Sequence, residues 1–281
     1  MVHFMDWLTE PFALAAQQRA LLAGALAAVA LALVGTWVVV RGMTFLGDAL
    51  VHGVIPGIAL ATIVGFAPLL GALLAAAVMA AGINYVHRQT HLSEDTGIGL
   101  LFVGMLGLGV MLVPSSDPEH LSEILFGDPF GVTSSDIALL VAVVVVVLAT
   151  SVLLYRSFLV LSFNEMKAQL LGLRPRSAHL ALVALITFSI VGSFRVVGTL
   201  LVFGLLVGPA ATAALLVKRV PAMMVTAAAI GAGSVVVGLI VSYHANTSAS
   251  ATVAVVPVAI FFVVLAVRSL TRGSPALAPG G

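Results

Sequence analysis

The chain has 281 residues, of which 61% are hydrophobic and 8% are charged, and its formal net charge at pH 7 is +1. Soluble globular proteins carry about a quarter of their residues as charged side chains, so this composition excludes that class and indicates a multi-pass membrane protein. The absence of cysteine excludes disulfides and thiolate metal sites, and the lack of Lys and Arg runs excludes a nucleic-acid-binding surface.

Charge-poor runs of about 20 residues, divided at Pro, Gly and polar clusters, predict eight or nine membrane-spanning helices. The unbroken valines of Val143–Val147 do not alternate with polar residues as the strands of a β-barrel would. We therefore expect an all-α, polytopic transmembrane helical bundle. Its clearest spans are Leu21–Val40, Ala49–Gly65, Leu69–Val86, Gly97–Val113, Ile137–Tyr155, Ala178–Phe194, Val196–Val217, Ala222–Ser242 and Ala251–Val267.

The distribution of basic residues predicts the orientation of these spans, because Lys and Arg near span ends favour the cytoplasmic side. Arg156–Ser177 contains four basic residues and is expected inside, whereas Pro114–Ser135 contains none and is expected outside. Counting span by span places the N-terminus outside and leaves Arg195 as the one exception. The domains expected are an extracytoplasmic segment (1–20), a single membrane domain (21–268) and a short flexible tail (269–281).

Two segments, Gly53–Gly57 and Gly204–Gly208, have the spacing G-x-x-x-G. Small residues at this spacing let two helix backbones approach closely in a membrane. In a chain with 27 glycines the spacing also arises by chance, so both interpretations stay open.

Asp48 and His52 are the only Asp, Glu, Lys, Arg or His residues from Gly42 to Asn84. Ionisable side chains in a membrane are costly and usually functional, and residues four apart share one helix face. Pro56 lacks an N–H, so the His52 carbonyl loses its usual helical donor. A carboxylate, an imidazole and a carbonyl would suit a divalent first-row metal ion. The alternative is that Asp48 caps the second span and His52 bonds a neighbouring helix.

Several motifs of energy-coupled or hydrolytic proteins are missing from the sequence. The chain has no phosphate-binding loop G-x-x-x-x-G-K-[ST], no H-E-x-x-H and no G-x-S-x-G, so we expect no enzyme activity and no permanently bound cofactor. Coupling to an ion gradient favours several buried carboxylates, yet Asp48 is the only clear one. This pattern favours an external motor over a gradient.

Five ordered segments resemble the ABC-3 family, the permease subunits of metal-transporting ABC importers, over about Pro11 to Val267. These segments are VRGMTFLGDALVHGVIPGIALA (Val40–Ala61), EDTGIGLLF (Glu94–Phe102), LFGDPFGV (Leu125–Val132), VVGTLLVFGLLVGPAATA (Val196–Ala213) and GLIVSY (Gly238–Tyr243). The resemblance implies that Asp48 and His52, which occupy the acid and histidine of the family pattern D-A-L-x-H, lie on the translocation path. This chain departs from the family pattern at three places. Val51 stands where Ser is usual, and Asn164 and Glu165 stand where Asp-Pro is common. Ser248–Ser250 stands where the family has a Pro-Ser-Gly-like turn.

The resemblance also implies partners: a cytoplasmic ATPase subunit, an extracytoplasmic metal-binding protein and a second permease copy in a homodimer. Glu165, Ala168 and Gly172 match the acid, alanine and glycine of the loop that contacts the ATPase, although on physical grounds this segment is simply a short amphipathic surface helix.

We therefore expect a permease in the bacterial plasma membrane, in contact with lipid, that transports a divalent cation (manganese, zinc or iron) as substrate. A gradient-driven secondary transporter and a membrane scaffold without substrate are the alternatives.

Overall fold

The computed structural model describes residues 10–89, 93–112, 126–163 and 175–271. In this part of the chain every regular element is helical and there is no strand, which confirms the all-α prediction. The elements are η1 (Glu10–Phe12), α2 (Ala15–Val40), α3 (Thr44–Gly53), α4 (Ile55–Val64), α5 (Pro68–Gln89), α6 (Glu94–Leu112), α8 (Ser134–Leu153), α9 (Tyr155–Phe163), α11 (Pro175–Leu216), α12 (Val220–Ala245) and α13 (Ala249–Thr271).

Seven helical segments among the described residues are long and apolar enough to cross a membrane. One of them, Thr44–Val64, combines α3 and α4, and another, Ser177–Leu216, is 40 residues long and holds enough chain for two spans. The apolar part of α5, Pro68–Ile83, is shorter. Counting the two arms of α11 separately and adding α5 agrees with the predicted bundle of eight or nine spans.

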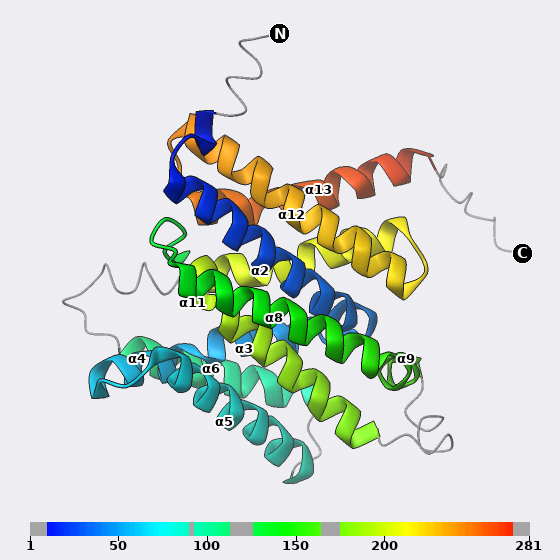
Figure 1. The fold of residues 1–281 in the computed structure, drawn as a ribbon. Helices are drawn as coiled ribbons and strands as arrows, with labels where there is room; N and C mark the ends of the chain where they lie inside the picture. Colours follow the sequence, from blue (N-terminus) through cyan, green and yellow to red (C-terminus); the bar gives the residue numbers. More distant parts are fainter. Residues whose placement is uncertain (1–9, 90–92, 113–125, 164–174, 272–281) are drawn as a thin grey trace, which may run out of the picture.

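The two arms of α11 meet at Gly198, whose backbone angles (φ 72°, ψ 165°) are not helical. Figure 1 shows the chain turning back within α11, where light green passes into yellow. Gly127 (φ 69°) packs against this turn, and a Cβ atom on Gly127 would lie 2.6 Å from the Gly198 nitrogen. Two of the family-like segments, Leu125–Val132 and Val196–Ala213, therefore meet in space at a pair of glycines that no larger residue could replace without displacement.

Several segments with basic residues, which the charge pattern predicts on the cytoplasmic side, lie at one end of the bundle. In Figure 1, α9, the α11–α12 connection and the C-terminal end of α13 lie at one end, opposite the turn of α11 and the α4–α5 connection. At the first end, Arg41 Nη1 lies 3.3 Å from His179 Nδ1, which joins the end of α2 to the start of α11. We call this end inner and the opposite end outer.

Both G-x-x-x-G segments lie at close helix contacts. Gly57 on α4 and Gly71 on α5 face each other, and a Cβ on either would collide with the backbone carbonyl of the other. A Cβ on Gly208 would lie 3.0 Å from Pro257 on α13. The glycines therefore serve helix packing. By contrast, only 17% of the α6 span and 22% of the α13 span are buried, so much of their apolar surface faces outward from the chain.

Candidate metal site

The local fold places Asp48 inside a helix and not at its start. The turn after α2 contains Gly42 in a left-handed conformation (φ 67°), and α3 begins directly afterwards, at Thr44. Met43 is the N-cap residue, and no side chain caps the helix. The predicted start at Ala49 is therefore wrong, and so is the interpretation of Asp48 as a helix cap. Asp48 has a full helical turn of chain before it in the same span.

The structure brings Asp48 and His52 together. The distance from His52 Nε2 to Asp48 Oδ1 is 3.6 Å, and the two side chains are 22% (His52) and 27% (Asp48) exposed. Within the described part of the chain, no hydrogen bond to the Asp48 carboxylate is formed. A carboxylate oxygen and an imidazole nitrogen thus lie together on one partly exposed face of α3, as their spacing of four residues predicts.

The imidazole of His52 is held from one side by an aromatic ring. The ring centroids of His52 and Phe102, on α6, are 5.8 Å apart in a T-shaped arrangement, and Phe45 lies 6.4 Å from Phe102. His52 Nδ1 is buried and has no hydrogen-bond partner among the described residues. The nitrogen available to a ligand is therefore Nε2, the one that faces Asp48.

The backbone next to His52 differs in part from the expectation. The helix is interrupted at Val54, two residues before Pro56. Pro56 has no N–H to donate to the His52 carbonyl, so the loss of its usual helical donor holds as expected. Val51 is completely buried in the core, so position 51 does not lie on the exposed face that carries Asp48 and His52.

The pair would offer two side-chain ligands to a metal ion. No group of three or more His, Cys, Asp or Glu side chains with metal-binding geometry occurs in the parts of the chain that the structure describes. Water, or groups from another molecule, would have to complete the coordination of a metal ion held here. The predicted ATPase-contact residues, Glu165, Ala168 and Gly172, lie in 164–174, outside the described residues.

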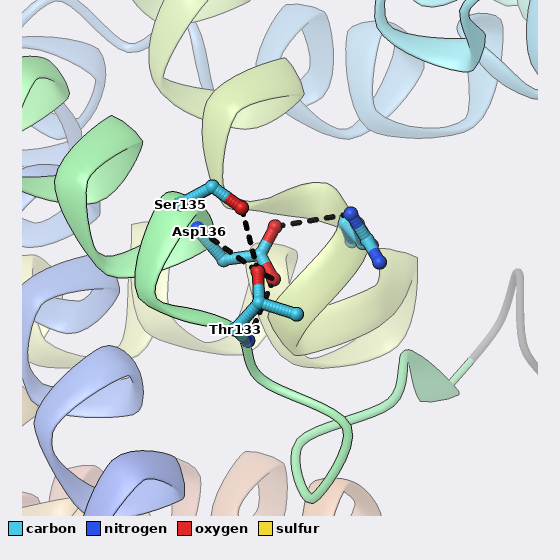
Figure 2. A network of polar contacts seen from close by, with 4 residues as sticks. Thr133, Ser135 and Asp136 are labelled. Atoms are coloured by element: carbon cyan, nitrogen blue, oxygen red, sulfur yellow. Dashed lines mark hydrogen bonds and ion pairs between the residues drawn. The ribbon is translucent and has the colours of Figure 1, made fainter.

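A second acid–base pair, not predicted from the sequence, lies at the outer end. Asp136 in the first turn of α8 forms a capping box with Thr133, and Figure 2 shows these residues with Ser135. Asp136 Oδ1 accepts a hydrogen bond from Arg195 Nη1 at 3.2 Å, and the Asp128 N–H donates to the Arg195 carbonyl. The only signal in the sequence was that Arg195 departs from the pattern of basic residues inside. The ion pair with Asp136 balances the positive charge of Arg195 at the outer end.

The fold defines a multi-pass membrane protein whose clearest polar feature inside a span is a carboxylate–imidazole pair. A family model described as "ABC 3 transport family" matches residues 14–268. The chain belongs to this family, as its sequence resemblance implied.

Named relatives and a solved structure agree with this assignment. The chain is 33% identical over 262 residues to "Probable iron transport system membrane protein" of Haemophilus influenzae, covering 93% of this chain and 97% of the relative. It is 34% identical over 247 residues to "Manganese transport system membrane protein MntC" of Listeria monocytogenes, covering 88% of each. The structure of PsaBC from Streptococcus pneumoniae in complex with Fab has a chain that superposes with a TM-score of 0.86 at 27% identity, over 96% of this chain and 99% of that one.

Proposed function

We propose that the chain is the permease subunit of an ATP-binding-cassette importer and that it moves a divalent metal cation across the bacterial plasma membrane. Asp48 and His52 serve as transient ligands of the cation. The observation that carries this proposal is their arrangement: an acid and an imidazole 3.6 Å apart, both partly exposed, inside a membrane span. The names of the relatives, which refer to manganese and iron, support a first-row metal as substrate.

The chemistry of the pair suits a site that a cation must leave. Carboxylate oxygen and imidazole nitrogen bind Mn²⁺, Fe²⁺ and Zn²⁺. With only these two side chains, the cation keeps water molecules or takes ligands from a second copy of the chain, and its affinity stays modest. Modest affinity is what transport requires, since a site that binds too tightly cannot release its ion.

The remaining parts of the importer would be supplied by partner proteins. The segment containing Glu165, Ala168 and Gly172 lies in sequence between α9 and α11, both of which reach the inner end, where a cytoplasmic ATPase subunit would dock. An extracytoplasmic metal-binding protein would deliver the cation at the outer end. A homodimer would place two Asp48–His52 pairs around one path.

Metal uptake by cells that carry single variants tests the proposal. Asp48→Asn and His52→Ala should each reduce initial uptake of radioactive Mn²⁺ or Fe²⁺ at least roughly tenfold at equal membrane expression, since each removes a ligand. Asp95→Asn and His244→Ala are matched controls, because both residues are exposed and lie near helix ends; they should retain uptake. Normal uptake by both Asp48→Asn and His52→Ala would remove the pair from the mechanism.

Reconstitution distinguishes this importer from a gradient-driven transporter. Purified chain in liposomes without an ATPase subunit should show no metal uptake under an imposed proton or sodium gradient. Uptake by the chain alone would overturn the ATP-driven proposal and favour the secondary transporter.

A further inference from the structure

A cavity of about 560 Å³ lies near the outer end of the bundle, between α4, α5, α8 and α11. Its floor is apolar and buried, formed by Ile58, Ala72 and Val191, and its rim includes the exposed Thr62 and Leu69. No residue of α3 or α6 lines it, so it is separate from Asp48 and His52. Its volume falls in the range of small-molecule sites, about 300–1,000 Å³.

The rim of this cavity carries the Asp136–Arg195 pair. The Asp136 side chain is only 10% exposed, whereas that of Arg195 is 71% exposed. The second oxygen of Asp136 accepts hydrogen bonds from the Thr133 N–H and hydroxyl, so the carboxylate is fixed in place. A guanidinium has five N–H donors, and among the described residues the Asp136 carboxylate is its only side-chain partner. The remaining donors of a held but exposed guanidinium are thus available beside an apolar cavity.

The position in the membrane limits what can fill such a site. The outer ends of spans lie at the level of the lipid headgroups, and an apolar floor gives water few hydrogen-bond partners. An acyl chain suits the floor, and a phosphate group matches the fork of N–H donors of arginine. We propose that the cavity binds a phospholipid of the outer leaflet, with one acyl chain between α4, α5 and α11 and with phosphate oxygens on the Arg195 guanidinium.

Arg195 and Asp136 have opposite roles in this site. Arg195 donates to the phosphate, whereas Asp136 holds Arg195 but also competes with the phosphate for its N–H groups. Replacing Asp136 by Asn keeps an acceptor for the Thr133 N–H and removes the competing charge. Asp136→Asn should therefore strengthen phospholipid binding, and Arg195→Gln should weaken it. A pair that served stability alone would make both variants lose lipid alike.

Native mass spectrometry measures this binding. The sample is the purified full chain with added phosphatidylglycerol, or with diacylglycerol of the same acyl chains. The wild type should retain phosphatidylglycerol in preference to diacylglycerol and should show no adduct with inorganic phosphate. Arg195→Gln should weaken phosphatidylglycerol binding at least about tenfold, the loss expected for a charge-assisted hydrogen bond. Arg268→Gln, an arginine-to-glutamine change on α13, should leave it unchanged.

A third variant tests the acyl-chain part of the site without touching the ion pair. Thr62→Trp places a large side chain on the exposed rim and should reduce retention of both lipids. Equal retention of the two lipids by the wild type would overturn the proposal, as would equal loss in Asp136→Asn and Arg195→Gln. An adduct with inorganic phosphate that requires Arg195 would show an anion site and would overturn the assignment to a lipid.

Discussion

The Asp48–His52 pair in α3 and the Asp136–Arg195 pair between α8 and α11 both join a carboxylate to a nitrogen base, but their surroundings differ. Asp136 accepts three hydrogen bonds, two from Thr133 and one from Arg195. Asp48 faces His52 at 3.6 Å, and His52 Nδ1 has no partner within the described residues. Buried polar groups are normally satisfied, and those that are not require an explanation. The Asp136 carboxylate is hydrogen-bonded on both oxygens and joins α8 to α11, whereas the Asp48 carboxylate and His52 Nε2 lie 3.6 Å apart on a partly exposed helix face.

The largest effect is expected when both members of the α3 pair are replaced. Asp48→Asn combined with His52→Gln should reduce metal uptake to background, because neither the carboxylate nor the imidazole remains. The free energy of unfolding in mixed micelles should change by less than about 1 kcal/mol, since the pair is partly exposed and makes few other bonds. Denaturation of purified protein checks the second part. A large loss of stability would mean that the pair is structural, like its counterpart at the outer end.

The next effect concerns the glycines that support the outer pair. Gly127→Ala should destabilise the protein by about 1–3 kcal/mol, because Gly127 has a positive φ and its Cβ would meet the backbone at Gly198. Gly233→Ala is the matched control, since a Cβ there meets no atom within 4 Å. Thermal unfolding of both variants measures the contrast. Equal melting temperatures would show that the turn of α11 does not depend on this contact.

The smallest effects are expected within the outer pair itself. Thr133→Ala should cost about 1 kcal/mol, the usual cost of losing a helix cap, whereas Arg195→Gln should cost less, because its side chain is mostly exposed. The free energies of unfolding of the two variants test this order. A greater loss for Arg195→Gln would show that the ion pair between α8 and α11 contributes more to stability than the cap of α8.

Sequence reasoning predicted those features that depend on local pattern. The apolar runs located the spans, including a division of α11 near Arg195, and the spacing of four residues placed Asp48 and His52 on one face. The start of α3 was missed because the left-handed Gly42 lets a new helix begin within three residues of α2.

Features that depend on tertiary contact could not be predicted in this way. Asp136 and Arg195 are 59 residues apart in sequence, and Gly127 meets Gly198 only after α8 and the first arm of α11 have packed. The burial of Val51 likewise follows from where the helix begins. A single sequence contains no periodic signal for any of these contacts.

The break at Val54 would limit how far a cation bound to Asp48 and His52 affects the span. A divalent ion held by Asp48 and His52 would cross-link two successive turns of α3, a helix of only ten residues. Because the helix ends one residue after His52, that stiffening would stop at Gly53 and would not extend into α4. A bound ion would therefore stiffen α3 alone. The inner half of this span would become more rigid when the ion binds and less rigid when it leaves.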